Sequence, residues 1–473
     1  MRIIDRIYID GQFVVPQGEE FGDLFNPATE ERIGRVHLAD AGDARRAVAA
    51  AKRAFPAFAR TPKTERIALL RRLHDAVAAR AADLAPVMAE EYGAPAYFVD
   101  GTVNRAATVF LDMAETLERF EFDERIGRAE VALQPLGVVA AITPWNANYG
   151  FISAKVAAAL AAGCPVVVKP SEMSALQTDL LTQAMHEADI PPGLVNIVTG
   201  TGPVVGEALS THADVAKVSF TGSTATGRAI LQAASGTFKR VTLELGGKGP
   251  SLILDDADFD AAAKQAAMMG VMNSGQACVA GTRILVPRAR SGEFLPRLEA
   301  ALAALKVGPA SDPAAMIGPM VSARQWERVQ GYIRLGQEEG GRIVLGGEGR
   351  PDGIERGWFA RPTLFAGVRN DMRIAREEVF GPVLSVIAYD SEEEAIAIAN
   401  ESPYGLQAYV MSGDTDHARV VAAKLDCGRV VINGAAHEPQ APFGGMKQSG
   451  IGREFGRAGL LAHLEAKAVI FPG

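Results

Sequence analysis

From residue 137 onward, the sequence alternates short apolar runs with alanine-rich segments that are long enough to form helices. This alternation predicts parallel strands joined by crossover helices that cover both faces of a sheet. The runs fall into two series, 137–142, 165–168, 194–198, 216–220 and 241–245, then 251–254, 283–286, 384–389, 407–411 and 429–432. We therefore expect an α/β protein with two domains that divide near residue 246.

The two ends of the chain do not follow this alternation. Before residue 120 the pattern is mostly helical: apolar residues from Leu69 to Met88 recur at helical spacing, and Thr64 is a candidate cap. Segment 125–134 and the final "KAVIFPG" fit neither sheet. We expect them to form a small extension whose open edge can add to the sheet of a partner subunit.

Composition excludes several classes of protein. The 473 residues carry a net charge of −8 without any dominant Lys/Arg cluster, which argues against a nucleic-acid surface. The longest apolar run, 156–168, is too short for a membrane span of roughly 20 residues, and the amino terminus has no signal-peptide core. Cys164, Cys278 and Cys427 are widely spaced, so neither a disulfide framework nor a metal site is predicted. We expect a soluble, cytoplasmic protein.

Polar and glycine residues follow one predicted strand after another. They are Asn146, Lys169, the glycines of "TGTG" (199–202), the glycines of "FTGSTATG" (220–227) and Glu244. Because ligands of open α/β sheets bind beyond the carboxyl ends of the strands, these features predict one binding edge.

Each of these features also has an ordinary explanation. The motifs "GTGPVVG" and "GSTATG" suit a backbone that approaches a phosphate, but they also suit a plain strand-to-helix turn. Lys169 is either a ribose or phosphate contact or a solvated lysine. Glu244 is either a desolvated general base or a salt-bridged carboxylate, and Asn146 either an oxyanion donor or a loop residue.

Cys278 lies in "NSGQACVAGTR", a run of small and polar residues. A cysteine of the core usually has aliphatic neighbours, whereas small neighbours leave room for a molecule to approach the sulfur. On local grounds a nucleophile and a structural thiol are equally acceptable interpretations.

Seven motifs occur in order along the chain: "TPWN", "VVVKPSE", "FTGSTATG", "LELGGK", "GQACVAGTR", "EEVFGPV" and "PFGGMKQSGIGRE". Together they closely resemble the NAD(P)-dependent aldehyde dehydrogenase superfamily, and the match runs from "FNPATEE" at residue 25 to the last strand. The resemblance implies an aldehyde-dehydrogenase-like fold with two doubly wound α/β domains and a small β oligomerisation extension. The implied domains are dinucleotide-binding (1–120 and 136–245), catalytic (246–445) and oligomerisation (121–135 and 446–473), in a homodimer or homotetramer.

The resemblance also assigns roles to residues. Cys278 is the implied nucleophile, Glu244 the general base, and Asn146 forms an oxyanion hole with the backbone amide of Cys278. The implied cofactor is NAD, with NADP as the alternative. The implied cofactor-binding residues are Thr143, Pro144, Trp145, Lys169, Glu172, Gly202, Gly222, Ser223, Gly227, Leu245, Glu378 and Phe380.

Glu172 favours NAD over NADP. It follows Lys169 by three residues, where a carboxylate can accept hydrogen bonds from ribose hydroxyls but repels a 2′-phosphate.

The segment after Asn146 favours a bulky, aromatic, uncharged aldehyde as substrate. By the resemblance, this segment borders the substrate tunnel. Ala147 and Ala154 provide little side-chain volume, Phe151 and Phe443 offer apolar lining, and no arginine or lysine occurs between Asn146 and Ala154. Many relatives place an aromatic-proline-aliphatic turn directly after Asn146, and this sequence departs from that pattern. A second departure is His463, at a place that is often tyrosine.

Three rival functions remain at this stage. In a CoA-acylating dehydrogenase, CoA takes the acyl group in place of water, but such enzymes commonly lack the glutamate that this chain keeps at Glu244. A non-catalytic binding protein of the same fold would need neither Cys278 nor Glu244. A cofactor-free thiol hydrolase would use the same thiol.

Overall fold

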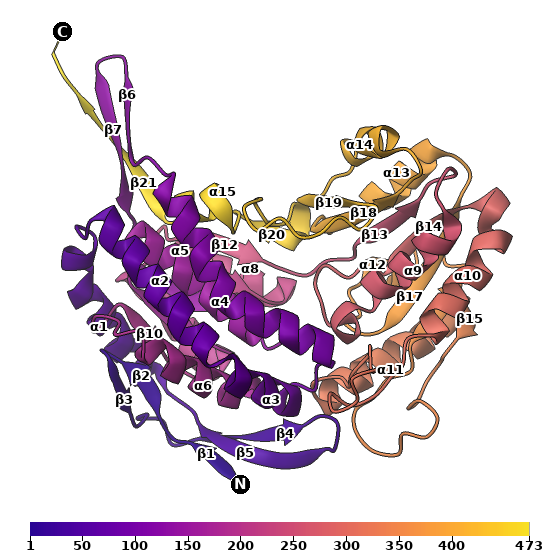
Figure 1. The fold of residues 1–473 in the computed structure, drawn as a ribbon, viewed down its shortest axis with the longest axis horizontal. Coiled ribbons are helices and arrows are strands. Elements are labelled where there is room, and N and C mark those ends of the chain that lie inside the picture. Colours follow the sequence, from indigo (N-terminus) through magenta and orange to yellow (C-terminus); the bar gives the residue numbers. More distant parts are fainter. Residues whose placement is uncertain (473) are drawn as a thin grey trace.

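Two mainly parallel sheets form the cores of the two lobes of the computed structural model, which describes residues 1–472 (Figure 1). The first sheet has the strand order β20 (Gly450–Ile451), β12 (Arg240–Glu244), β11 (Val215–Thr221), β8 (Val138–Ile142), β9 (Val166–Lys169), β10 (Val195–Ile197), β2 (Ile7–Ile9) and β3 (Gln12–Val14). The five central strands are parallel, and β20, β2 and β3 are antiparallel to their neighbours.

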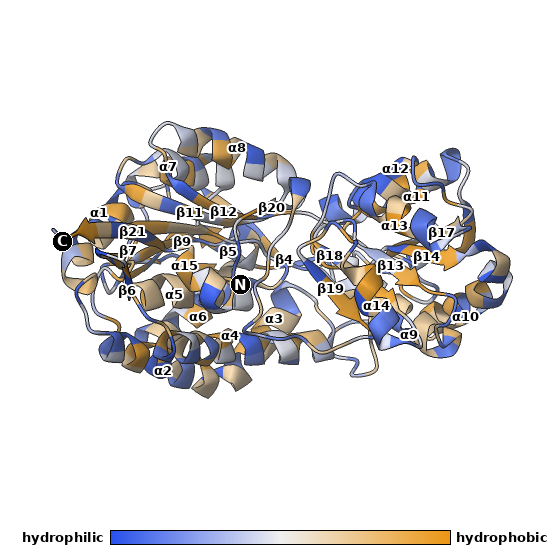
Figure 2. Ribbon diagram, turned by 90° about the horizontal axis from the view of Figure 1, so that it is seen from above, coloured by the Kyte–Doolittle hydropathy of each residue, from blue (hydrophilic) through white to orange (hydrophobic). Residues whose placement is uncertain are grey.

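Helices cover both faces of this sheet. On one face, α2 (Lys63–Ala79), α4 (Ala96–Glu118), α5 (Asn148–Ala162) and α6 (Ala175–His186) share a core with alternate residues of β8 and β9. On the other face, α1 (Ala41–Phe58), α7 (Glu207–Thr211) and α8 (Thr224–Ser235) pack against the remaining residues of these strands (Figure 2). Burial on both faces explains why the strand sequences are continuous apolar runs.

The second sheet has the strand order β15 (Arg342–Leu345), β16 (Thr363–Ala366), β17 (Val383–Tyr389), β14 (Arg283–Pro287), β13 (Pro250–Ile253), β18 (Gln407–Met411) and β19 (Arg429–Ile432). All neighbours except β15 and β16 are parallel. One face holds α9 (Phe259–Gly270) and α10 (Ser291–Ala303). The other holds α11 (Ala323–Glu338), α12 (Arg373–Arg376), α13 (Glu392–Asn400) and α14 (Thr415–Ala422).

The two-domain α/β prediction is confirmed, and each of the ten predicted strands is found within one residue at both ends. The predicted helix around residues 69–88 is wrong in detail. It is two helices, α2 and α3 (Ala81–Glu91), which divide at Arg80, and α2 begins after Pro62 rather than at a Thr64 cap.

A small antiparallel sheet projects from the first lobe, at the upper left of Figure 1. It consists of β6 (Asp123–Ile126), β7 (Ala129–Pro135) and β21 (Leu464–Ile470). Because β21 pairs with β7, the sheet joins segments that are more than 300 residues apart in the sequence. Within the predicted segment 446–473, β20 and α15 (Gly456–Leu461) lie with the first lobe, and Gly473 lies outside the described residues. A role of this sheet in oligomerisation stays a prediction.

A further sheet near the amino terminus was not predicted. It has the order β1 (Arg2–Ile4), β5 (Glu31–His37) and β4 (Phe21–Asn26). Within residues 1–472, none of the helices combines the length and apolar character that crossing a bilayer requires.

Candidate active site

A cleft of about 560 Å³ is lined by residues of both lobes. The first lobe contributes residues that follow β8, β11 and β12, and the second contributes the loop around Cys278 and the turn that precedes β17. The predicted binding edge is therefore a real cleft, within the roughly 300–1,000 Å³ range of ligand pockets.

The loop that carries Cys278 has a strained backbone. It leaves α9 through Asn273 and Ser274, whose φ angles are 52° and 60°, and through Gly275 at 73°. A Cβ on Gly275 would lie 2.2 Å from the backbone of Gly381, so only glycine fits there. Gln276 then anchors the loop, because its Oε1 accepts a 3.0 Å hydrogen bond from the amide of Val321. Cys278 itself is half-buried and lines the cleft.

Asn146 is bound directly to this loop. Its Nδ2 donates to the carbonyl of Gln276 at 2.9 Å, and the Nδ2 of Asn273 donates to the carbonyl of Asn146 at 2.9 Å. A side-chain amide carries two hydrogens. Asn146, the predicted oxyanion donor, is thus held by Gln276, which precedes Cys278 by two residues in the sequence. The second hydrogen of its amide is available to a ligand.

Glu244, the last residue of β12, is only 3% exposed. Within residues 1–472 neither carboxylate oxygen has a hydrogen-bond partner. Burial, and next the nearby charge of Glu454, raise the pKa of Glu244 well above its usual range. A buried carboxyl without partners is suited to hold a water molecule and to accept its proton.

Lys155 and Glu454 form a buried ion pair near Glu244. The Nζ of Lys155 lies 2.5 Å from Oε1 of Glu454 and 2.9 Å from Oγ of Ser219. Glu454 belongs to the quoted "IGRE" motif, but sequence reasoning gave it no role. Its position beside Glu244 depends on a contact between residues 299 apart.

The surroundings of Cys278 disfavour the thiolate. Burial, followed by the charges of Glu378 and Glu244, raises its pKa to about 12, while Arg429 acts in the opposite direction. Because the thiolate is the nucleophile, the proton has to leave before Cys278 can attack a carbonyl.

Eight of the twelve predicted cofactor residues line the cleft, namely Pro144, Trp145, Glu172, Gly222, Ser223, Leu245, Glu378 and Phe380. The other four are not among the residues that line it. The amide of Thr143 donates to the carbonyl of Lys169, whose Nζ lies 3.1 Å from Oε2 of Glu172. Gly227 packs so closely on Leu245 that a Cβ would lie 2.5 Å from that side chain. Gly202 begins the short helical turn Gly202–Gly206 and has open space above it.

Glu378 and Phe380 lie on a turn with fixed geometry. Oε1 of Glu378 accepts a 3.0 Å hydrogen bond from the amide of Gly247, and burial raises the pKa of Glu378 to about 7. Phe380 has a φ of 62°, and its ring meets that of Trp145 edge-on at 5.6 Å. Backbone strain of this kind persists where the surroundings enforce it and is concentrated at functional sites.

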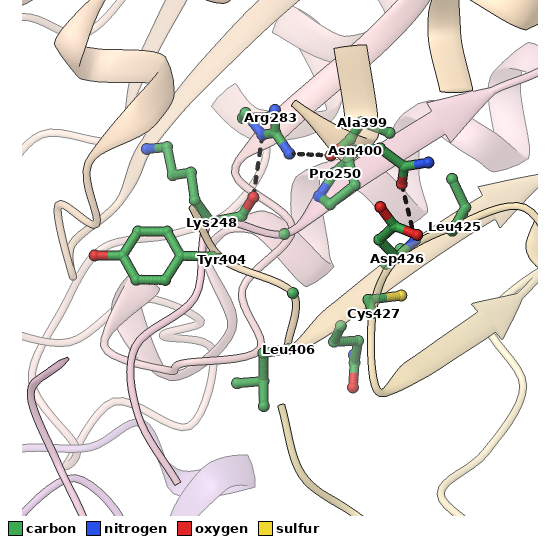
Figure 3. A pocket seen from close by; sticks show the side chains of 14 residues that line it. Lys248, Pro250, Arg283, Ala399, Asn400, Tyr404, Leu406, Leu425, Asp426 and Cys427 are labelled. Atoms are coloured by element: carbon green, nitrogen blue, oxygen red, sulfur yellow. Dashed lines mark hydrogen bonds between the residues drawn. The ribbon is translucent and has the colours of Figure 1, made fainter. Parts of the chain in front are cut away.

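A small neighbouring pocket shows how the turn after Glu244 is held (Figure 3). Arg283 is 1% exposed, and its guanidinium donates to the carbonyl oxygens of Lys248 at 3.0 Å and Ala399 at 2.9 Å. The pocket, of about 10 Å³, has room for about one water molecule. Lys248 has no hydrogen-bond partner for its Nζ within residues 1–472, and burial lowers its pKa to about 7. We infer that the hydrogen bonds of Arg283 beside this pocket hold the turn after Glu244 in position.

The four predicted substrate residues do not share one lining. Phe151 lines the cleft, and Ala147 precedes the first turn of α5. Ala154 lines a separate cavity of about 20 Å³ with Lys155 and Phe455. Phe443 pairs its backbone with that of Glu454.

Among residues 1–472, no group of three or more His, Cys, Asp or Glu side chains is placed to hold a metal ion.

Comparison with known proteins gives consistent matches over the whole chain. The family model described as "Aldehyde dehydrogenase family" matches residues 13–469. The chain is 45% identical over 472 residues to 3-succinoylsemialdehyde-pyridine dehydrogenase of a Pseudomonas species, covering 99% of both chains.

Solved structures agree. Aldehyde dehydrogenase C of Pseudomonas syringae, a mutant solved with NAD⁺ and octanal, has a TM-score of 0.97 and 42% identity, covering 98% of this chain and 96% of that one. An aldehyde dehydrogenase of Mycobacterium tuberculosis in complex with NAD⁺ has a TM-score of 0.97 and 40% identity, covering 100% and 99%.

Proposed function

Since the chain belongs to the aldehyde dehydrogenase family, we propose that it oxidises an aldehyde to the carboxylic acid through Cys278, with NAD as cofactor and water as the acyl acceptor. The observation that carries this proposal is the convergence of Cys278, Asn146 and Glu244 on one cleft, which the predicted cofactor residues also line. Solved relatives that share 40–42% identity with the chain bind NAD⁺.

The residues of the cleft fit a dinucleotide. The amino end of α8, with Gly222 and Ser223, opens into the cleft, and such an end favours a phosphate. Glu172 and Glu378 provide carboxylates for ribose hydroxyls, and Thr221 has a buried hydroxyl without a hydrogen-bond partner within residues 1–472. Glu172 favours NAD over NADP because it would repel a 2′-phosphate.

The chain's own residues account for the covalent steps. The Cys278 thiol first releases its proton to solvent, and the thiolate then adds to the aldehyde carbon. The oxyanion of the resulting thiohemiacetal accepts hydrogen bonds from Asn146 Nδ2 and the Cys278 amide. When bound, NAD⁺ supplies the hydride acceptor that turns this adduct into a thioester. Glu244 takes a proton from water, which attacks the thioester carbon and releases the acid and the Cys278 thiol. In total, aldehyde, NAD⁺ and water give acid, NADH and a proton.

Glu244 favours hydrolysis over transfer to CoA. Its buried oxygens lack partners within residues 1–472, which leaves them available to a water molecule beside the thioester. An enzyme that transfers the acyl group to CoA must keep water away from the thioester, so it would have no use for this carboxylate.

We propose a bulky or aromatic aldehyde as the substrate. The ring of Phe151 lines the cleft, and Ala147 at the start of α5 carries a small side chain, which supports this class. The relatives point in the same direction, because one is named for a pyridine-containing semialdehyde and another was solved with octanal.

We also propose that the sheet of β6, β7 and β21 mediates a homodimer or homotetramer. β6 is exposed along its whole length and leaves an edge on which a partner can pair.

The test is NADH formation with acetaldehyde, succinic semialdehyde, benzaldehyde and phenylacetaldehyde, each with and without CoA. We expect NADH without CoA, and the highest kcat/KM for an aromatic aldehyde. If NADH forms only when CoA is present, the acyl acceptor is CoA rather than water. If no aldehyde gives NADH, the proposed function is rejected. A higher kcat/KM for acetaldehyde would reject the substrate class.

A further inference from the structure

Five side chains from distant parts of the sequence form a cluster, which we call the cationic rim: Arg105, Arg429, His437, Phe443 and Phe455. The Arg429 guanidinium lies 4.9 Å from the centre of the Phe443 ring, and that of Arg105 lies 5.4 Å from the Phe455 ring. The two phenylalanine rings are 5.9 Å apart, and His437 is 6.0 Å from Phe455. The rim is therefore a continuous set of rings and cations.

The rim is connected to two segments of the candidate active site, the loop of Cys278 and the start of α5. Arg429 Nε donates to Gln407 Oε1 at 2.5 Å, and Gln407 contacts Tyr409, whose hydroxyl donates to the carbonyl of Val279, next to Cys278. At the other side, Arg105 lies against Gly150, in the first turn of α5 after Asn146. These contacts place the rim beside the loop of Cys278 and the first turn of α5.

The two arginines differ in how their charge is balanced. Arg105 forms an ion pair with Asp112. Within residues 1–472, Arg429 has no carboxylate within 4 Å, and it donates only to neutral acceptors, the amide oxygen of Gln407 and Nδ1 of His437 at 3.1 Å. A neutral imidazole can accept this bond at Nδ1, and desolvation and both arginines lower the pKa of His437. Arg429 is thus a half-buried cation without a counter-ion.

We propose that Arg429 is a specificity-determining residue that binds a carboxylate at the far end of the substrate, so that the preferred substrates are carboxylated aromatic aldehydes. This inference rests on the proposed function, because it concerns the tail of the aldehyde that Cys278 attacks. A guanidinium binds a carboxylate with charge-assisted hydrogen bonds, and the Phe443 and Phe455 rings suit a planar tail.

This inference revises the expectation of an uncharged substrate. That expectation rested on the absence of arginine between Asn146 and Ala154. The fold brings Arg429 to the site from β19 and Arg105 from α4, which lie far away in the sequence.

The experiment compares two substrates of nearly equal shape that differ in charge, 4-formylbenzoate and its methyl ester, by NADH formation. Because charge-assisted hydrogen bonds are worth roughly ten- to hundredfold in binding, we expect the wild-type kcat/KM to favour the acid by at least about tenfold. Arg429→Gln should reduce this ratio to about one, and Arg429→Lys should retain part of it. A ratio within one enzyme cancels any general loss of activity.

Arg105→Gln is the matched control, because the charge of Arg105 is already balanced by Asp112. It should change the acid-to-ester ratio by less than about threefold. A wild-type ratio near one, an unchanged ratio in Arg429→Gln, or an equal loss in Arg105→Gln would each overturn the inference. If Arg429→Gln does not fold, the acid-to-ester ratios of the wild type and of Arg429→Lys still test the inference. Oxidation of benzaldehyde without any preference for the acid would leave the proposed function intact, whereas no NADH with any aldehyde would reject that function.

Discussion

Replacement of Glu244 by glutamine should separate the two halves of the reaction. The side chain is 3% exposed, and glutamine has nearly the same volume, so the packing around it should persist. Glutamine cannot take a proton from water. General-base catalysis contributes roughly 10²–10⁴-fold, so we expect steady-state turnover to fall by about this factor.

The first turnover should survive the same substitution. Thioester formation precedes the step that needs Glu244, so stopped-flow absorbance should show a burst of about one NADH per active site before slow turnover. Cys278→Ser should give no burst and serves as the control. If the first turnover of Glu244→Gln slows as much as its steady state, Glu244 acts before hydrolysis, for example on the proton of Cys278, and the assignment is wrong.

Stability gives an independent check that the variant is folded. Folding raises the pKa of Glu244 above its usual value of 4.5, so the folded protein binds this proton more tightly than the unfolded chain does. The free energy of unfolding therefore falls as pH rises from 4.5 toward the raised pKa. Glutamine removes this effect, so Glu244→Gln should equal or exceed the wild type in stability, by a margin that grows with pH. If Glu244→Gln melts at a lower temperature than the wild type at neutral pH, the buried carboxyl of Glu244 is not destabilising and this reasoning is wrong.

Three further predictions follow from single residues. Cys278→Ser should abolish NADH formation but leave the dissociation constant of NAD⁺ within about threefold by calorimetry, whereas Cys427→Ser should retain turnover. Glu172→Gln should raise kcat/KM with NADP relative to NAD, because a repelling carboxylate is removed, and an unchanged ratio would refute the role of Glu172. Arg283→Met should destabilise the protein by about 3–5 kcal/mol in urea unfolding, since it leaves the carbonyls of Lys248 and Ala399 without donors, and a loss below about 1 kcal/mol would contradict this.

The sheets were predictable from sequence because their central strands are buried on both faces. The run "VVAAI" of β8 is apolar at every position, which distinguishes it from the amphipathic helices around it. Several missed strands are exposed or very short: β1 and β5 carry arginines on an open face, β2 has three residues and β20 has two. β16 was also missed although its four residues are all buried, and burial does not explain that miss. The break between α2 and α3 at Arg80 has neither glycine nor proline to mark it.

Three predicted site residues line one cleft, and the sequence signals for them were local. Asn146 and Glu244 follow or end predicted strands, and small residues surround Cys278, of which Gly275 has a φ of 73°. Glu454 and Arg429 were not assigned, because their roles depend on contacts with residues far away in the sequence, such as the pair of Lys155 and Glu454. No local pattern distinguishes Arg429 from the other arginines of a surface strand.

The electrostatics of the cleft connect substrate recognition with catalysis. Desolvation raises the pKa of Cys278, Glu244 and Glu378, and the two carboxylates further disfavour the thiolate. Arg429 is the cation that acts on Cys278 in the opposite direction. A carboxylate bound to Arg429 would offset part of that effect, so tight binding of the tail and activation of the thiol compete. The planar spacer of an aromatic aldehyde would limit this competition, because it holds the carboxylate at a fixed distance from the aldehyde carbon that the thiol attacks.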